Sequence, residues 1–135
     1  MKEITVPATV ENIAVVTDFA DEQLEALDCS MKAMMQINVA IDEILANIAF
    51  YAYPGHGGTV TMQVEIREDT RTAVLTFIDS GIPYNPLEKE EPDVTLSLEE
   101  RQIGGLGIFL VKKSMDDMNY ERKDGQNILT LRKHI

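Results

Sequence analysis

Three short stretches of the sequence carry polar residues or glycines that simple packing does not explain. In the first, Glu43 and Asn47 stand four residues apart within the apolar segment INVAIDEILANIAFYAY. Residues four apart lie on the same face of a helix, and two such polar groups on a buried helix need polar partners. A stripe of solvated side chains on the helix surface is the alternative interpretation.

The second stretch, DSGIPYNP at positions 79–86, directly follows the apolar run AVLTFI. We expect Asp79 at the end of a strand, where its carboxylate can accept a hydrogen bond from an exocyclic amine such as that of adenine. Gly81 would allow a flat ligand to approach the backbone closely. Because the same residues are typical of an ordinary turn, this motif alone is a weak signal.

The third stretch, GGLGIFLVKK, begins with Gly104, Gly105 and Gly107. Glycines at the start of a helix expose backbone N–H groups, and the positive end of the helix dipole favours phosphate oxygens there. The stretch matches neither the loop G-x-x-x-x-G-K-[ST] nor a dinucleotide fingerprint, which requires a parallel βαβ unit. The order of the three stretches along the chain indicates that one protein contains a metal site, a nucleobase site and a phosphate site.

The segments between these stretches predict the elements that must position them. Apolar residues three or four apart indicate helices over residues 8–27, 30–53 and 104–118. Alternation and composition predict strands over residues 3–6, 59–68, 71–79, 119–123 and 127–135, the last two as a hairpin. Residues 80–103 are rich in proline and acids, and a loop of this length is usually functional, often a lid.

This order of elements predicts the fold class. We expect one domain, residues 1–135, folded as a two-layer α/β sandwich with a mainly antiparallel sheet and three helices on one face. The lid would lie between the strand over residues 71–79 and the last helix.

Composition limits the class of function. The formal net charge of −11 argues against a basic surface that binds nucleic acid. The sequence has no basic leader followed by an apolar segment and no uninterrupted run of about eighteen apolar residues, so we expect a cytoplasmic protein with no membrane partner. Cys29 is the single cysteine, which excludes an intrachain disulfide, and we expect a small buried or half-buried thiol there rather than a nucleophile. No Cys/His spacing supports a metal site.

Together, the segments DEILANIAFYAYP, DSGIPYNPLE and LEERQIGGLGIFLVKKSMDDMNYERKDGQNILTLRK resemble the histidine-kinase-type ATPase domains of the gyrase, heat-shock chaperone, histidine kinase and mismatch-repair (GHKL) superfamily. The resemblance covers nearly the whole chain. Within that superfamily, the chain is most similar to the bacterial anti-sigma factors that act as serine/threonine kinases on anti-anti-sigma proteins.

The resemblance implies roles for the first two stretches. Glu43 matches the glutamate that acts as general base on the hydroxyl of the substrate serine. Asn47 matches the asparagine that holds Mg²⁺ against the phosphates of ATP. Asp79 matches the aspartate that recognises adenine, and Gly81 matches the glycine that lets the base approach.

The resemblance also implies phosphate and base contacts nearer the C-terminus. Arg101 matches an arginine that precedes the last glycine box in related kinases and contacts phosphate. Asn127 lies where relatives carry a threonine beside the adenine. The glycine box itself, which wraps the phosphates beneath the lid, corresponds to Gly104, Gly105, Leu106 and Gly107.

The function implied by the resemblance is transfer of the γ-phosphoryl group of ATP, with Mg²⁺, to a serine of an anti-anti-sigma (STAS-type) partner. An RNA polymerase sigma factor and a second copy of the chain are implied as further partners. A non-catalytic alternative is an ATP-binding partner-switching module that sequesters a sigma factor or regulates a phosphatase. A histidine kinase catalytic domain, a gyrase-like or chaperone ATPase, and an α/β domain without a nucleotide site are less favoured alternatives.

Overall fold

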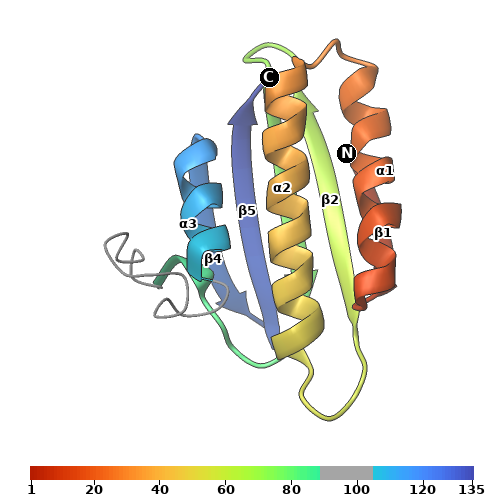
Figure 1. Cartoon of the computed structure of the whole chain (residues 1–135), viewed down its shortest axis with the longest axis vertical. Coiled ribbons are helices and arrows are strands. Elements are labelled where there is room, and N and C mark those ends of the chain that lie inside the picture. Colours follow the sequence, from red (N-terminus) through yellow and green to blue (C-terminus); the bar gives the residue numbers. More distant parts are fainter. Residues whose placement is uncertain (89–104) are drawn as a thin grey trace.

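The computed structural model of the chain describes residues 1–88 and 105–135. Figure 1 shows its helices and strands, which follow one another as β1 (Lys2–Pro7), α1 (Ile13–Glu25), α2 (Met31–Asn47), β2 (Thr59–Arg67), β3 (Thr72–Asp79), α3 (Gly105–Ser114), β4 (Asp117–Lys123) and β5 (Gln126–His134). Short helical turns are η1 (Val10–Asn12), the π-helical turn η2 (Ile48–Ala52) and η3 (Pro86–Glu88).

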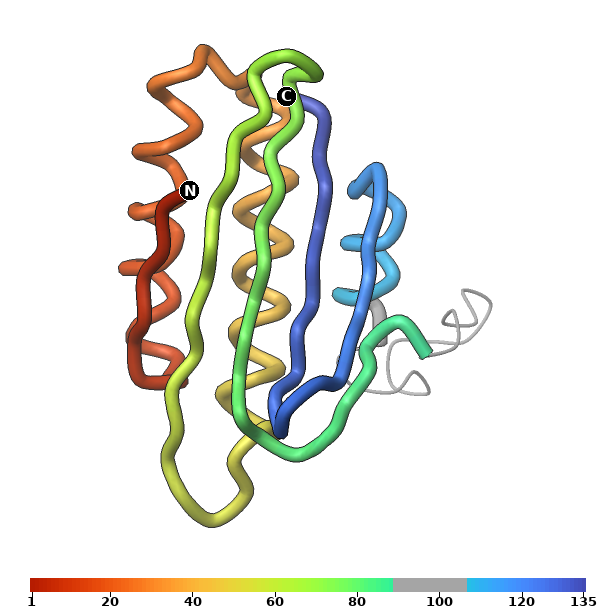
Figure 2. The backbone as a smooth tube through the Cα atoms, turned by 180° about the vertical axis from the view of Figure 1, so that it is seen from behind, coloured from red at the N-terminus to blue at the C-terminus, as the bar shows by residue number. Residues whose placement is uncertain are grey.

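The five strands form one antiparallel sheet in the order β1-β2-β3-β5-β4. All three helices cover one face of this sheet (Figure 1), and the view from behind shows the strands with no helix in front of them (Figure 2). The predicted two-layer α/β sandwich is therefore confirmed. The register of β3 and β5 sets Asp79 opposite Asn127, which matters for the site described below.

The core lies between the two layers and is centred on α2. Ile37 and Ile41 on the inward side of α2 are fully buried, as are Leu75 and Phe77 of β3. Ser30 caps the helix, because its hydroxyl accepts a hydrogen bond from the Ala33 N–H at 3.1 Å. Burial of this apolar face against the sheet is what holds α2 in the middle of the helical layer.

The outward side of α2 is also apolar, with Met31, Met35 and Val39 exposed. By length and composition alone, the helical segment Met31–Ala52 is apolar enough to cross a membrane, with 39% of its most apolar window buried. Core helices of soluble proteins pass the same test, so this is weak evidence. The expectation of no membrane partner stays a prediction.

Among the predicted helix boundaries, the start of the first helix and the end of the last one were clearly wrong. The first helix begins at Ile13 rather than at residue 8, because Val10–Asn12 form a separate 3-10 turn. The last helix ends at Ser114 rather than at residue 118, because Asp117 and Met118 pair with β5. Met115 and Met118 are three apart and fit a helical period, but strand pairing decides the conformation of Met118.

The predicted hairpin between β4 and β5 is confirmed. Asp124 and Gly125 both have positive φ angles, 52° and 76°, as a two-residue type I′ turn requires. The predicted lid falls mostly on residues 89–104, which lie outside the described residues.

Candidate functional site

A pocket lies where the end of α2 and the turn η2 meet the ends of β3, β4 and β5. It encloses about 480 Å³ of empty space, part of it open to solvent. Its walls are Ile44, Asn47, Ile48, Tyr51, Ala52, Phe77, Asp79, Ile82, Tyr84, Pro86, Ile108, Tyr120, Asn127 and Leu129. Most of these side chains are apolar or aromatic, so the few polar groups among them determine what the pocket can recognise.

Asp79 ends β3 and is only 6% exposed. Its Oδ1 accepts two hydrogen bonds, from the Gly81 N–H and from Asn127 Nδ2, both at 2.9 Å. No hydrogen bond within the described residues reaches its Oδ2. One oxygen of a buried carboxylate is therefore held in place, and the other is left to accept from a ligand.

Asn127 faces Asp79 from β5 and is equally buried, at 6% exposed. Its Nδ2 donates to Asp79 Oδ1 at 2.9 Å and to the Ile82 carbonyl at 2.8 Å. Its Oδ1 accepts from the Tyr84 N–H at 3.2 Å and from the Tyr120 hydroxyl at 2.5 Å. A side-chain amide has two donor hydrogens and two acceptor positions, so the protein itself uses all of them.

Gly81 is required by a close approach of two backbone segments. A Cβ at this position would overlap the carbonyl oxygen of Ala52, the last residue of η2. That carbonyl accepts from the Ile82 N–H at 2.9 Å, and Arg122 donates to the Gly81 carbonyl at 2.8 Å. In this structure the group that comes close to Gly81 is the Ala52 carbonyl, and the approach of a flat ligand to this glycine stays a prediction.

Asn47 is the last residue of α2 and lines the same pocket as Asp79. Its Nδ2 is buried and has no hydrogen-bond partner among the described residues. An unsatisfied buried polar group costs about 1–3 kcal/mol, so this amide is suited to a bound polar group. The π-helical turn that follows, Ile48–Ala52, is a feature often found at functional sites.

Glu43 lies one turn before Asn47 and is half-buried, whereas its neighbour Asp42 is exposed. A Cβ on Gly107, in the first turn of α3, would overlap the Glu43 carboxylate. The α2 carboxylate therefore lies against the N-terminal turn of α3, where the helix dipole favours negative charge. Of the two adjacent acids, Asp42 is the solvated one, and only Glu43 faces α3.

Several residues that sequence reasoning missed hold these segments in place. The Tyr53 hydroxyl accepts from the Ser80 N–H at 2.8 Å and donates to the Thr59 carbonyl at 2.6 Å. Lys112 of α3 donates to the Leu87 carbonyl of η3 at 2.9 Å. These contacts join elements far apart in the sequence. For Tyr120, the alternation in NYERK was an available signal of an inward-facing side chain.

Two groups with shifted pKa values lie outside the pocket, near the other end of α1 and α2. Burial raises the pKa of the Asp21 carboxyl, and a hydrogen bond with Asn38 of α2 opposes the shift. Burial also raises the pKa of the Cys29 thiol, although the nearby Arg71 opposes it. Cys29 is half-buried, as expected, and a raised pKa keeps it from acting as a thiolate nucleophile at neutral pH.

The sequence as a whole matches a known domain type. The profile of the histidine kinase-like ATPase domain matches residues 6–133, which is nearly the whole chain. The chain belongs to the histidine kinase-like ATPase domain family.

Curated proteins with similar sequences include two bacterial protein kinases and an anti-sigma factor. The serine/threonine-protein kinase BtrW of Bordetella bronchiseptica is 33% identical over 106 residues, which cover 78% of this chain and 73% of the relative. The serine-protein kinase RsbW of Bacillus mycoides is 25% identical over 131 residues, 94% and 81% of the two chains. The anti-sigma F factor of Clostridium acetobutylicum is 25% identical over 111 residues, 82% and 73%.

Solved structures of histidine kinases share the fold of this histidine kinase-like ATPase domain. The histidine kinase domain of the blue-light activated histidine kinase EL346 from Erythrobacter litoralis aligns with a TM-score of 0.55 at 14% identity, covering 79% of this chain and 50% of that one. The histidine kinase AdeS of Acinetobacter baumannii aligns with a TM-score of 0.52 at 11% identity, covering 99% and 68%. At this identity the likeness concerns the fold alone.

The predicted site residues of this histidine kinase-like ATPase domain fall into three groups. Asn47, Asp79 and Asn127 line one pocket, with Gly81 in the turn beside it. Glu43 and Gly107 contact each other at the start of α3, and α3 begins with Gly105 and Leu106. Arg101 and Gly104 lie outside the described residues.

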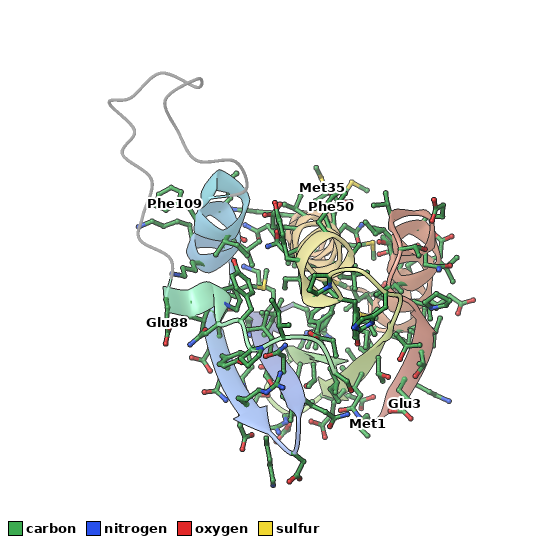
Figure 3. The ribbon with its side chains drawn as sticks, turned by 90° about the horizontal axis from the view of Figure 1, so that it is seen from below. Met1, Glu3, Met35, Phe50, Glu88 and Phe109 are labelled. Carbon is green, nitrogen blue, oxygen red and sulfur yellow. The ribbon has the colours of Figure 1, made fainter. Side chains whose placement is uncertain are left out.

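Figure 3 looks along α2 from below and shows α3, with Phe109, beside it.

Proposed function

We propose that the chain, as a single domain over residues 1–135, binds ATP with Mg²⁺ and transfers the γ-phosphoryl group to a serine or threonine of a protein partner. The observation that carries the proposal is that one pocket is lined by both the buried Asp79 carboxylate and Asn47, whose Nδ2 has no hydrogen-bond partner among the described residues. The similar proteins named serine-protein kinases support the reaction class.

Asp79 would recognise the adenine ring. Its open Oδ2 can accept a hydrogen bond from the exocyclic amine, while Ile44, Ile48 and Leu129 provide apolar walls for the base. Water excluded from such walls no longer competes for the carboxylate, which strengthens its hydrogen bond to the ligand. Gly81 and Asn127 would contribute by fixing the turn and the carboxylate.

Asn47 fits a magnesium ligand. An amide can rotate to present its oxygen where Nδ2 now lies without a partner, and Mg²⁺ prefers oxygen ligands. The ion, when bound, would neutralise charge on the phosphates as the γ-phosphoryl group is transferred. The backbone N–H groups at the start of α3, from Gly105 to Gly107, together with Gly104 and Arg101, would contact the phosphates.

Glu43 would be the catalytic base. Its carboxylate lies against Gly107 at the N-terminal turn of α3, one helical turn from Asn47, so phosphate and base would meet at the same place. A carboxylate in this position can accept the proton of the attacking hydroxyl. A protein that only binds ATP does not need this group, which favours the kinase over a non-catalytic module.

The resemblance of the sequence to anti-sigma kinases leads to the proposed partners. We propose an anti-anti-sigma protein of the STAS class as substrate, with an RNA polymerase sigma factor and a second copy of the chain as further partners, in the cytoplasm. An anti-sigma F factor among the similar proteins supports this regulatory setting.

Calorimetry and a phosphotransfer assay test the proposal. Wild type should bind ATP more tightly with Mg²⁺ than with EDTA, and Asn47→Ala should lose that difference. Glu43→Gln should bind ATP within about twofold of wild type but transfer phosphate at least ~100-fold more slowly to a serine-bearing partner. Glu22→Gln, at an exposed acid of α1, is the matched control.

The outcomes separate the candidate functions. Binding of ATP without transfer to any serine-bearing anti-anti-sigma protein would leave the non-catalytic partner-switching module. Absence of nucleotide binding by wild type, with or without Mg²⁺, would reject both functions.

A further inference from the structure

The backbone fixes the orientation of the Asn127 amide. The Ile82 carbonyl can only accept and the Tyr84 N–H can only donate, and both contact this amide, at 2.8 and 3.2 Å. The Tyr120 hydroxyl adds a donor to the amide oxygen. Rotating the amide by half a turn would set donor against donor and acceptor against acceptor, so the positions of Nδ2 and Oδ1 are determined.

The oriented amide in turn fixes which oxygen of the Asp79 carboxylate faces the pocket. Asn127 Nδ2 and the Gly81 N–H both donate to Asp79 Oδ1 at 2.9 Å. Because Asp79 and Asn127 are direct partners in the register of β3 and β5, this contact is built into the sheet. Two donors on one oxygen leave Oδ2 as the part of the carboxylate that faces a ligand.

We propose that Asn127 is a positioning residue that orients the Asp79 carboxylate for the base without touching the nucleotide. By holding Oδ1 it turns Oδ2, also an acceptor, toward the pocket, where it suits a purine with a 6-amino group and disfavours one with a 6-oxo group. This inference rests on the proposed nucleotide site and revises the expectation that Asn127 contacts the base, since the chain uses all four hydrogen-bonding positions of its amide.

The first test replaces an acceptor oxygen of residue 79 by a donor while Asn127 is kept. In Asp79→Asn, the two donors at Asn127 and Gly81 would still require an oxygen, so the new NH₂ group would face the base. We expect the preference for ATP over ITP, which carries a 6-oxo group, to fall at least ~10-fold. In the double variant Asp79→Asn with Asn127→Ala, this additional fall in the ATP preference should be largely lost, because only the Gly81 N–H would remain to orient the amide of residue 79.

An isosteric change at residue 127 gives a readout that needs no nucleotide. Asn127→Asp would set a second carboxyl against Asp79 of β3, with Tyr120 and Arg122 of β4 and Tyr84 of the following loop around it. One proton shared by the pair restores a donor, so the variant should be destabilised relative to wild type at pH 8 and recover at pH near 5. Tyr120→Phe, which leaves the Asp79 contact in place, should show no such pH dependence.

The two experiments fail in different ways. If wild type binds neither ATP nor ITP, the proposed function fails, while thermal unfolding of Asn127→Asp against pH still tests the coupling of residues 79 and 127. The positioning role is wrong if wild type prefers ATP but the two variants, Asp79→Asn and Asp79→Asn with Asn127→Ala, have the same ratio of ATP to ITP affinity. If Asn127→Asp does not fold at any pH, the ATP and ITP measurements on the Asp79→Asn variants decide.

Discussion

At the residue scale, two glycines of the candidate site are needed for different reasons. A Cβ at Gly81 would meet the backbone carbonyl of Ala52, which is held by the π-helical turn and by its hydrogen bond from the Ile82 N–H. A Cβ at Gly107 would meet the end of the Glu43 side chain, which can rotate away. Gly81 is therefore needed for two backbone segments to pack together, and Gly107 is needed to leave room for the Glu43 carboxylate.

This difference predicts opposite phenotypes for two alanine substitutions. Gly81→Ala should lose about 1–3 kcal/mol of unfolding free energy, because rigid backbone has to move. Gly107→Ala should keep near wild-type stability, since alanine favours a helix, but displacement of Glu43 should slow phosphotransfer by at least ~10-fold.

Urea denaturation and the phosphotransfer assay measure the two effects. Gly57→Ala is the control, because within the described residues no atom other than those of its chain neighbours lies within 4 Å of a Cβ placed there. Equal stability losses in Gly81→Ala and Gly107→Ala would contradict this account of the two glycines.

At the element scale, α2 combines a core face with an exposed apolar face. Ile41 is 0% exposed, whereas Val39, two residues earlier, is 52% exposed. Because burial and not hydrophobicity alone stabilises the fold, these neighbours should differ sharply in their contribution.

Truncation of each side chain tests this contrast. Ile41→Ala should cost about 2–5 kcal/mol of unfolding free energy, because a cavity is left in the core. Val39→Ala should change it by no more than about 0.5 kcal/mol, as is usual for exposed positions. Urea unfolding of both variants checks the prediction, and a loss above about 2 kcal/mol at Val39 would show that its exposed face is covered by another part of the protein.

The contact between α1 and α2 makes a prediction about pH. Burial raises the pKa of Asp21 above its ordinary value of 3.8, although a hydrogen bond with Asn38 opposes the shift. Despite that bond, the Oδ1 atoms of both Asp21 and Asn38 are buried without a partner among the described residues. An acid with a raised pKa in the folded state destabilises the fold as pH rises through that pKa. Asp21→Asn cannot ionise and supplies a donor for Asn38.

We therefore expect Asp21→Asn to raise Tm at pH 7 by about 2–8 °C, the equivalent of one hydrogen bond. The gain should shrink as pH falls toward 3.8, where wild-type Asp21 is itself becoming protonated. Thermal unfolding monitored by circular dichroism at both pH values measures it. A gain that does not depend on pH would assign the effect to the new hydrogen bond alone.

At the scale of the whole molecule, the net charge of −11 opposes a polyanionic ligand unless a cation is bound with it. A ligand that binds only the folded state raises stability by about 2.7 kcal/mol when present at 100 times its Kd. ATP should therefore raise Tm in the presence of Mg²⁺ and much less with EDTA. Asn47→Ala should reduce the Mg²⁺-dependent part of the shift, and an equal shift with EDTA would contradict a role for the ion.

Much of the fold could be predicted from local patterns. Alternation placed Asp79 at the end of a strand, and helical spacing placed Glu43 and Asn47 on one face of α2. Local periodicity could not separate Met115 from Met118, because a spacing of three suits a helix and pairing with β5 decides that Met118 is in a strand. Sequence patterns were therefore sufficient where neighbours along the chain determine the conformation.

The sequence by itself determined the order of elements, the two-layer class and the chemical types at the site, because these depend on periodicity and residue identity. Only the tertiary structure decided that Ala52 is the group that requires Gly81, that the Glu43 carboxylate lies on Gly107, and that Asn127 has no hydrogen-bonding position left for a ligand. Each of these depends on atoms brought together from distant parts of the chain, where an approach of a few ångströms distinguishes a ligand contact from a structural one.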